Sequence, residues 1–535
     1  YTKGDAGQAK YLIVAAQAAD GYGDHTLANG TVAVLQSNGD SSNSAVQFGA
    51  LAGITNDSYL QLTALLNSVN KATFGKEDFY ISQTVIFDNS NLVIDGFGYT
   101  SSNIIALAGF SGTHLFESKS FGLKMNNIRL VGDGGTFGAA ATLKGLKLQR
   151  TDLTGNTDSF ITDCNFSKLL SGVDVYGRNT TITGCQFETS LGGIEQFVSP
   201  EGETRGLTVR NNRFHSMGNI GVVASCIKMN SVAFGNLITG NIGDGSVYNF
   251  YNGPTQGSEI TNNIINTLVN DGIISQGSTF LGLPLAGVIS DNVLSKGAAS
   301  YTGVCIQGQF NNTTINNNTC VGSTEHGIYA SSGGGNKITN NLILSHDFNN
   351  TGTFDGIKCD GTNNRVESNH VRSAGKLTVN SAINMSGGAG ILGDNFIDST
   401  YSTFYGGKTP DFNLTSVGVG FGTIPDTDLH LAGYESKITS PDAVKANPVR
   451  RTSEHTGPSG VFAGAELRSV AVSSSVGNEA VDCRMTVNNR TVIEDRLVAF
   501  FNGGLGLQSP DGTWYKLQPP NGGGTISWVS APYTP

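Results

Sequence analysis

The stretch ITDCNF at residues 161–166 contains the pattern that decides the fold of this chain. An apolar residue is followed by two polar residues, by Asn or Cys, by any residue, and by a second apolar residue. The pattern returns at intervals of 21 to 29 residues, and repeats of this length indicate a solenoid, a propeller or another array. Its Asn or Cys positions are Cys164, Cys185, Asn212, Asn241, Asn263, Asn292, Asn318, Asn341, Asn369 and Asn395.

A second short segment in most repeats begins at Gly, as in GVDV at 172–175 and GIEQ at 193–196. The first and third positions after the Gly are mostly apolar, and this alternation is typical of β-strands. Short strands joined by Gly, Asn and Ser turns predict stacked coils, each of which buries its apolar face against its neighbours. The recurring Asn is expected at a corner, where its amide bonds the amide of the next coil, and Cys164 and Cys185 are small apolar substitutes there.

The composition excludes several classes of protein. Low charge (14%) with 72 Gly among 535 residues usually indicates disorder, but the apolar residues here are periodic, so the Gly are interpreted as turns. The net charge of −10 argues against a nucleic-acid partner. No stretch is long enough to span a membrane. The seven Cys show no metal-binding spacing, so buried reduced thiols, no metal and no cofactor are expected.

The chain divides into three parts. Residues 1–47 are expected to be a lead-in from an upstream attachment region, and residues 48–405 form the repeat. A helix is predicted over 56–69, with Asn56 or Asp57 as its cap and one apolar face that closes the end of the solenoid. After a hinge, residues 406–535 are expected to be rich in β-structure, with antiparallel strands where apolar and polar residues alternate.

Three segments extend this interpretation through a resemblance. FYISQTV at 79–85 and LVIDGFG at 92–98, after the helix, resemble the start of pectate-lyase-like right-handed parallel β-helices, above all bacteriophage tailspikes and capsule depolymerases. VGVGFGTIPDTDLHL at 417–431 is similar to a segment in the C-terminal parts of phage tail fibres and tailspikes, except for the inserted Phe421. The resemblance implies an all-β chain with a carbohydrate-binding, catalytic β-helix and a C-terminal trimerisation or receptor-binding domain. It also implies a homotrimer in the virion tail, assembled in the host cytoplasm, attached upstream to the virion, and active at the host cell surface.

Paired carboxyls supply the predicted chemistry. Glycoside hydrolysis needs one protonated carboxyl to donate to the leaving oxygen and one ionised carboxyl to activate water or attack. Outward positions of neighbouring coils stack about 4.8 Å apart. In the outward column that begins with Asp174 and Glu195, these two carboxyls are adjacent, and their proximity is expected to raise one pKa. The column is predicted to continue through Val223, Ile274, Cys305, Tyr329 and Lys358.

The substrate groove is expected on the coils of residues 172–287. Tyr176 and Phe197 lie beside the carboxyl pair as flat surfaces for sugar rings, and the longest turns follow over 197–287, where insertions mark a binding face. These turns hold two further catalytic candidates and three aromatic residues expected to bind substrate: Asp244, Asp271, Tyr248, Phe250 and Tyr251.

Each assignment has a structural alternative. The carboxyl pair can be a solvated surface, the two Asp that precede Gly can shape turns, and the aromatic residues can pack against another chain. Glu325 and His326 with Asp355 form a rival carboxyl cluster. In tailspikes the catalytic acids have no local motif, so no residue is assigned from the resemblance.

The sequence thus predicts a phage tailspike that binds a bacterial surface polysaccharide (O-antigen, capsule or exopolysaccharide) and hydrolyses it as an endo-glycosidase. One alternative is a polysaccharide lyase, which needs a base for the C5 proton and groups such as Lys228 or Lys358 to neutralise a uronate. The other is a receptor-binding fibre without turnover. Saturated products, unsaturated products or intact polymer would distinguish these three functions. Deacetylation is a further alternative, and it would release acetate with the chain length unchanged.

Overall fold

A computed structural model of the chain describes residues 10–15, 19, 24–36, 43–134, 141–149, 157–197, 204–217, 225–229, 233–247, 249–255, 257–276, 279–280, 283–284, 286–296, 302–347, 351–372, 380–386, 390–397, 403–407, 449–456, 462–471, 481–487, 498–501, 504–508, 514–518 and 527–530. The chain forms two compact units, Tyr1–Gly422 and Thr423–Pro535. In the described part, no helix has both the length and the apolar character needed to cross a membrane.

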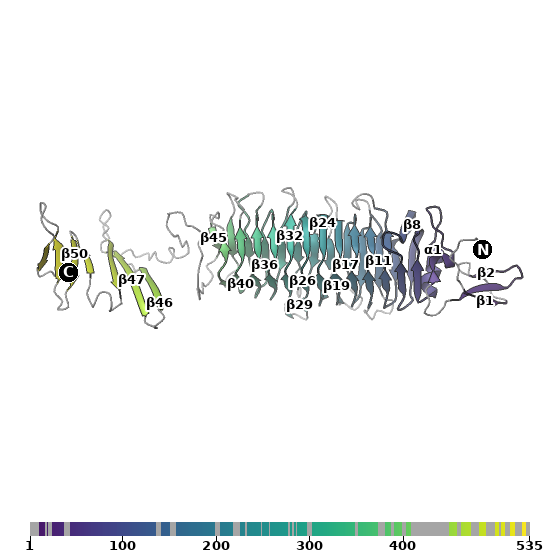
Figure 1. The fold of residues 1–535 in the computed structure, drawn as a ribbon, viewed down its shortest axis with the longest axis horizontal. Helices are drawn as coiled ribbons and strands as arrows, with labels where there is room; N and C mark the ends of the chain where they lie inside the picture. The colour runs from purple at the N-terminus through teal and green to yellow at the C-terminus, as the bar shows by residue number, and fades with distance from the viewer. Residues whose placement is uncertain are drawn as a thin grey trace. The chain divides into compact units, whose positions relative to one another are not determined.

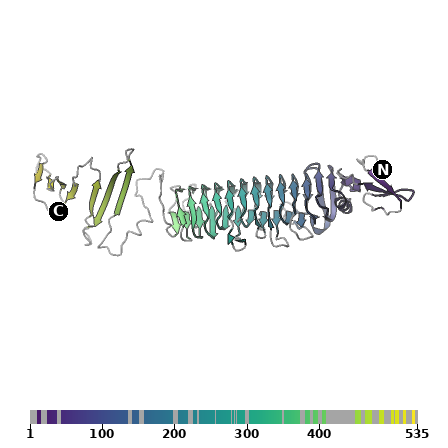
Figure 2. The same cartoon turned by 90° about the horizontal axis from the view of Figure 1, so that it is seen from below.

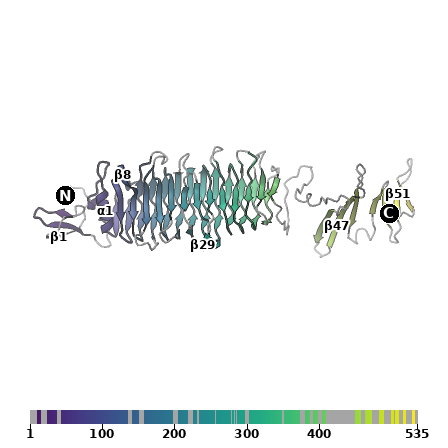
Figure 3. The same cartoon turned by 180° about the vertical axis from the view of Figure 1, so that it is seen from behind.

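The first unit is a parallel β-helix, as predicted (Figure 1). Each coil contributes a short strand to each of three parallel sheets, for example β15 (Thr181–Thr183), β16 (Gln186–Glu188) and β17 (Gly192–Gln196). Figures 2 and 3 show the same stack of coils from below and from behind. The second and third sheets are joined through two long strands, β6 (Asp78–Phe87) and β8 (Asn103–Ser118).

The remaining strands of the three sheets follow the repeat. The first sheet also contains β4 (Asn43–Ser44), β5 (Lys71–Phe74), β7 (Val93–Gly96), β9 (Lys124–Asn126), β12 (Phe160–Thr162), β19 (Thr208–Arg210), β23 (Leu237–Thr239), β26 (Glu259–Thr261), β31 (Val288–Ser290), β34 (Thr314–Asn316), β37 (Lys337–Thr339), β40 (Asn364–Glu367) and β43 (Gly390–Leu392). The second contains β10 (Arg129–Val131), β13 (Asn165–Ser167), β20 (Arg213–Met217), β24 (Ile242–Val247), β27 (Ile264–Leu268), β32 (Val293–Lys296), β35 (Thr319–Val321), β38 (Leu342–Leu344), β41 (His370–Arg372) and β44 (Phe396–Ile397). The third contains β11 (Lys144–Gln149), β14 (Ser171–Tyr176), β21 (Ser225–Met229), β25 (Asn249–Gly253), β28 (Ile273–Ser275), β33 (Ile306–Gln309), β36 (Ile328–Ser332), β39 (Ile357–Cys359), β42 (Ser381–Met385) and β45 (Thr403–Gly407).

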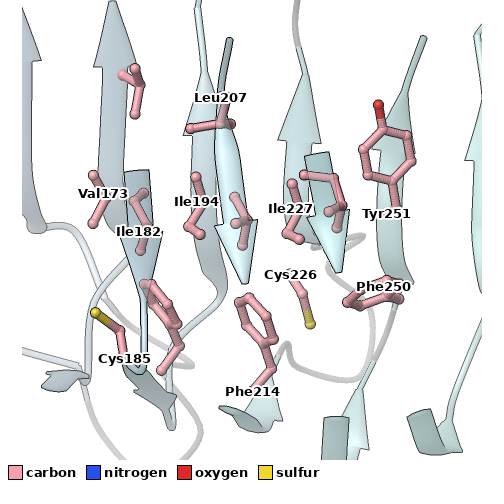
Figure 4. Close-up of a cluster of buried hydrophobic side chains, with 14 of the residues drawn as sticks. Val173, Ile182, Cys185, Ile194, Leu207, Phe214, Cys226, Ile227, Phe250 and Tyr251 are labelled. Carbon is pink, nitrogen blue, oxygen red and sulfur yellow. The ribbon is translucent and has the colours of Figure 1, made fainter. Parts of the chain in front are cut away.

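The core lies between the three sheets and is built in columns. The middle residue of a first-sheet strand, such as Ile182, points inward, as does Ile194 of the third sheet (Figure 4). Phe166, Phe187 and Phe214 of the second sheet stack with ring centroids 5.0 Å apart. Because each coil covers the apolar face of its neighbour, one continuous core runs through the solenoid.

The recurring Asn forms the predicted corner ladder. The side-chain amide of Asn212 donates to Oδ1 of Asn241 at 3.1 Å, and the same bond recurs on each following coil as far as Asn395. Cys164 and Cys185 occupy the first two positions of the column and are buried. The residue before the Asn has a positive φ in most coils, as at Asn211, Gly240 and Asn262, which explains the polar residue or Gly at that place.

Helix α1 (Tyr59–Ser68) buries Leu62, Leu65 and Leu66, as expected from its apolar face, and contacts β6. Its N-cap is Ser58, one residue beyond the predicted position, and Asp57 Oδ1 accepts the N–H of Tyr59 at 3.1 Å. The helix thus begins where an Asp side chain satisfies one of its free N–H groups.

Antiparallel strands occur near both ends of the chain. β1 (Lys10–Val14), β2 (His25–Thr26) and β3 (Val32–Gln36) form one small sheet. In the second unit, one antiparallel group comprises β46 (Val449–Thr456), β47 (Phe462–Ala471) and β48 (Val481–Val487). Another comprises β49 (Val498–Phe501), β50 (Gly504–Gln508), β51 (Trp514–Gln518) and β52 (Ser527–Ser530).

Candidate functional site

The outward residues of the third sheet form a polar column, called here the third-sheet face. The strand registers place these residues in the order Glu117, Lys147, Asp174, Glu195, Lys228, Asn252, Ile274, Gln307, Tyr329, Lys358 and Asn384. Between Asp174 and Lys358 this order differs from the predicted one at three places. Val223 lies outside the described residues, and Lys228 follows Glu195. Asn252 stands before Ile274, and Gln307 takes the place predicted for Cys305, which is buried.

Asp174 and Glu195 are adjacent in this column, as predicted. Asp174 is fully buried, however, and its Oδ2 lies 3.0 Å from His114 Nε2 and 2.7 Å from Lys144 Nζ. Burial opposes ionisation of Asp174, but the bonds from His114 and Lys144 outweigh it and lower the pKa. The pKa expected to rise in this pair is therefore not that of Asp174, because His114 and Lys144 bond to its carboxylate. The burial of Asp174 excludes direct contact with a polysaccharide in this conformation.

Glu195 is the accessible member of the pair. Its carboxylate lies 3.6 Å from Lys144 Nζ and 3.1 Å from Lys228 Nζ, and its side chain is 19% exposed. Since Lys144 contacts both carboxylates, the two contacted oxygens are no farther apart than the sum of the two contact distances. That maximum is shorter than the roughly 6.5–9.5 Å between the carboxyls of inverting glycosidases. The alternating charges make this cluster an ion network that joins neighbouring coils.

Tyr176, the last residue of β14, and Phe197, the residue after β17, form a stacked pair. Their ring centroids are 4.4 Å apart and their planes differ by 5°. Lys147 Nζ lies over the ring of Tyr176 and Lys144 Nζ over that of Phe197, at 5.5 and 4.9 Å from the centroids. Both rings are half-buried, so their outer edges form an aromatic surface beside Glu195.

A second group of charges, called here the Asp271 group, consists of Asp271, Lys296 and Glu325. These residues lie between the second and third sheets on three successive coils. Asp271 Oδ1 accepts the N–H of Val304 at 2.7 Å. Burial raises the pKa of Asp271 and lowers that of Lys296. Burial, together with the charge of Asp271, raises the pKa of Glu325. The group therefore favours one protonated carboxyl near one ionised carboxyl.

His326, directly after Glu325, and Asp355 on the next coil continue this region. The backbone N–H of Asp355 donates to His326 Nδ1 at 2.8 Å, and the Asp355 carboxylate accepts bonds from Asn380, Ser381 and Asn384. Burial raises the pKa of Asp355 and lowers that of His326 to about 4. His326 is therefore neutral at neutral pH, with its proton on Nε2.

Asp244 lies on the second sheet, away from the third-sheet face. Its carboxylate contacts His215 Nδ1 at 2.6 Å and accepts from Arg213 Nε at 2.9 Å. Burial opposes ionisation, but the bonds from Arg213 and His215 lower the pKa of Asp244. The structure therefore does not bring Asp244 together with the other predicted carboxyls, because strand β24 carries it on a different sheet.

Two of the three aromatic residues predicted in the 248–251 segment, Phe250 and Tyr251, do not line a surface. Phe250 and Tyr251 are fully buried in the core, and Tyr251 donates its hydroxyl to the carbonyl oxygen of Pro254 at 2.6 Å (Figure 4). Both side chains replace smaller core residues of neighbouring coils, which is why this aromatic cluster is a packing feature. Tyr248 lies outside the described residues.

Sequence reasoning missed three residues that shape these clusters: His114, Lys144 and Lys296. His114 is carried by β8, and Lys144 begins β11, a strand that is not predicted from the sequence. The alternating sequence KGLKLQ of β11 is the signal that could have revealed this strand.

Comparison with known proteins supports the fold. The family model described as "Right handed beta helix region" matches residues 152–283. No curated protein sequence matches the chain.

Among solved structures, a mutant tailspike of E. coli bacteriophage HK620, solved in complex with a hexasaccharide, is 11% identical and has a TM-score of 0.51 over 95% of this chain and 96% of its own. The Dettilon tailspike is 13% identical, with a TM-score of 0.46 over 92% of each chain. The A-module of the Azotobacter vinelandii mannuronan C-5 epimerase AlgE6 is 14% identical, with a TM-score of 0.43 over 69% of this chain and 97% of its own. The HK620 similarity supports the resemblance to tailspikes at the level of the fold.

Proposed function

We propose that this chain binds a bacterial surface polysaccharide along the third-sheet face and cleaves it as an endo-acting glycosidase. The β-helix fold, shared with a tailspike solved with a hexasaccharide, supports this class of function. The polar and aromatic side chains of the face support carbohydrate binding, because sugars need hydrogen-bonding groups and flat apolar surfaces together. Tyr176, Phe197 and Glu195 are the proposed binding residues.

The observation that carries the hydrolase proposal is the Asp271 group. Asp271 and Glu325 are carboxyls with raised pKa, and one coil that carries Lys296 lies between them. Two coils correspond to a separation of about 10 Å along the axis, close to the upper end of the range of inverting glycosidases. The negative charge of one carboxylate disfavours ionisation of the other. This favours a pair in which one carboxyl is protonated and can donate to the leaving oxygen.

In the proposed reaction, the protonated carboxyl of the pair donates to the glycosidic oxygen. The ionised carboxyl accepts a proton from the water that attacks the anomeric carbon. Lys296 stabilises the ionised member, because its charge lowers the pKa of both carboxyls. The pKa of Asp174 is lowered and its side chain is fully buried, so we assign its ion network to binding and to support of the face.

Product analysis tests this proposal. Wild-type protein is incubated with a panel of capsule, exopolysaccharide and lipopolysaccharide preparations beside Asp271→Asn, Glu325→Gln and Glu195→Gln. Glu259→Gln is the matched control, because Glu259 is exposed on the first sheet. We expect saturated oligosaccharides from wild type and control, and a loss of at least about a hundredfold in the Asp271 and Glu325 variants. Full activity of both variants contradicts the assignment, and loss in Glu195→Gln alone moves the reaction to Glu195 and the neighbouring Asp174.

The same experiment decides between hydrolysis and its alternatives. Unsaturated, ultraviolet-absorbing ends identify a lyase, for which Lys358 on the third-sheet face supplies a cation near a uronate. Retention of the polymer without shortening identifies a receptor-binding fibre.

We further propose that the chain acts as a homotrimer in a phage tail, held together by residues 406–535. The similarity in fold to a tailspike supports this assignment. Light scattering coupled to size exclusion should give three times the chain mass for the full chain, and a monomer at working concentration contradicts it.

A further inference from the structure

Strand β8 contains a bulge beside the third-sheet face. Its register with β6 changes from Gln83 opposite Ser111 to Val85 opposite Phe116, so that the four residues 112–115 face the single residue Thr84. Gly112 adopts a φ of 129°, and Thr84 Oγ1 donates to the carbonyl oxygen of His114 at 2.6 Å. Bulges re-aim side chains and occur beside active sites. Here the bulge places the consecutive side chains of Thr113 and His114 in one series of hydrogen bonds.

That series of hydrogen bonds runs from solvent to a buried carboxylate. Thr113 is exposed, and its Oγ1 lies 2.8 Å from Nδ1 of His114, which is 5% exposed. His114 Nε2 lies 3.0 Å from Oδ2 of the fully buried Asp174. Lys144 Nζ contacts the same oxygen at 2.7 Å and supports the ionised carboxylate. An ionised carboxylate can only accept, so His114 donates from Nε2 to Asp174, and in the tautomer with Nδ1 unprotonated it accepts a hydrogen bond from the Thr113 hydroxyl there.

We propose that Thr113, His114 and Asp174 form an acyl-transfer site that removes ester-linked acyl groups, such as O-acetyl, from polysaccharide sugars. Hydroxyl, imidazole and carboxylate in this order define the nucleophile, the general base and the group that orients the base. Thr113 and His114 are the catalytic residues, and Asp174 is a positioning residue. The site is next to the third-sheet face because Asp174 belongs to its column.

The reaction balances with water as the only co-reactant. Thr113 Oγ1 forms a bond to the ester carbonyl carbon as its proton moves to His114 Nδ1. The bond between that carbon and the sugar oxygen breaks, and His114 returns the proton to the sugar oxygen. Water, deprotonated by His114, then hydrolyses the acyl-threonine, which releases the carboxylic acid and restores the Thr113 hydroxyl.

Acetate release tests this site. The probes are 4-nitrophenyl acetate and an O-acetylated bacterial polysaccharide, each incubated with full-chain wild type, Thr113→Val and Thr113→Ser. Ser111→Ala is the matched control, since Ser111 is an exposed hydroxyl on the same strand outside this series of hydrogen bonds. We expect wild type, Thr113→Ser and Ser111→Ala to release acetate, and Thr113→Val to lose at least about a hundredfold. Thermal unfolding of each variant separates loss of chemistry from loss of fold.

A covalent trap gives a second readout. Acid quenching during turnover of 4-nitrophenyl acetate, followed by peptide mass spectrometry, should find one acetyl group on Thr113. Three results would each overturn the proposal. The first is equal acetate release by wild type and Thr113→Val, and the second is no release by wild type above that in buffer. The third is acetylation only at residues other than Thr113. This result is independent of glycoside cleavage. Acetate release depends on Thr113 and leaves the polymer length unchanged, whereas shortening of the polymer depends on the Asp271 group.

Discussion

Asn263 donates its side-chain amide to Oδ1 of Asn292 at 2.8 Å, and the backbone N–H of Asn263 donates to the same oxygen at 3.1 Å. Asn292 in turn donates to the carbonyl oxygen of Ile260 and to Oδ1 of Asn318. Each Asn is thus both acceptor and donor at the buried corner between two sheets. Leu could not replace it without leaving buried N–H groups of the preceding coil unpaired.

Asn292→Ala should therefore destabilise the solenoid strongly. Two donors of Asn263 lose their acceptor and two donor bonds of Asn292 are lost, so we expect a loss of about 3 kcal/mol in the free energy of unfolding. Guanidinium unfolding followed by circular dichroism measures it. The control is Asn316→Ala, which removes a half-buried amide on the outer face of the first sheet. Equal midpoints for both variants would show that the ladder does not govern stability.

The ion network predicts a pH-dependent effect of Lys144→Met. Removal of the Lys144 ammonium leaves the negative charge of Asp174 buried without its cationic partner. We therefore expect a loss of about 3–5 kcal/mol in the free energy of unfolding at neutral pH. The wild-type pKa of Asp174 is lowered in the folded state, so its stabilisation is present above the unfolded pKa of about 3.9 and is lost as the pH falls through the folded pKa.

The difference between wild type and Lys144→Met should accordingly shrink when the pH falls below about 4. The double variant Lys144→Met with Asp174→Asn should recover part of the loss at neutral pH. No recovery would mean that Lys144 acts through packing of its stem and not through its charge.

The repeat could be predicted from sequence because its spacing is short and its pattern local. The apolar residue three positions before each Asn or Cys, such as Ile182 before Cys185, indicates an inward position, and the recurring Asn predicts the ladder. The sequence pattern does not distinguish the second sheet from the first. The strands of the second sheet begin directly after the Asn or Cys of the corner, as β16 does at Gln186.

The charge clusters could not be predicted in the same way. Lys144 reaches Asp174, 30 residues later, only because β11 pairs with β14 in a particular register. Sequence spacing therefore identified the adjacent carboxyls Asp174 and Glu195 but not His114 and Lys144, whose bonds lower the pKa of Asp174. Likewise, Phe250 and Tyr251 had the composition of a sugar-binding loop, and only their registers with the neighbouring coils reveal that they fill the core.

Asp271→Asn should stabilise the fold at neutral pH. The pKa of Asp271 is raised in the folded state, so this group favours folding below its unfolded pKa, and that contribution is lost as the pH rises through the folded pKa. An amide removes the cost of burying a charge. Thermal unfolding at neutral pH and near pH 3 measures the effect: the variant should melt higher than wild type at neutral pH, and the gain should disappear near pH 3. A lower melting temperature at neutral pH would contradict it.

Helix α1 should act as the cap of the solenoid. Leu62→Ala creates a cavity between α1 and the first coils, and we expect a loss of about 3 kcal/mol in the free energy of unfolding. Leu60→Ala on the same helix is the matched control, since Leu60 is 50% exposed and should change stability by less than about 0.5 kcal/mol. If both variants unfold at the wild-type midpoint, the helix does not cap the core.

The stacked rings of Tyr176 and Phe197 predict the site of polysaccharide binding. Phe197→Ala removes half of the aromatic surface but leaves the Asp174 network in place, so we expect about a fivefold to tenfold rise in Kd for a polysaccharide that wild type binds. Phe97→Ala is the control, because Phe97 is 65% exposed and lies outside the third sheet. Isothermal titration with a cleavage-inactive Glu325→Gln background measures binding alone. If the two Phe variants bind equally well, the substrate does not contact the rings, and the binding residues must be sought nearer the Asp271 group.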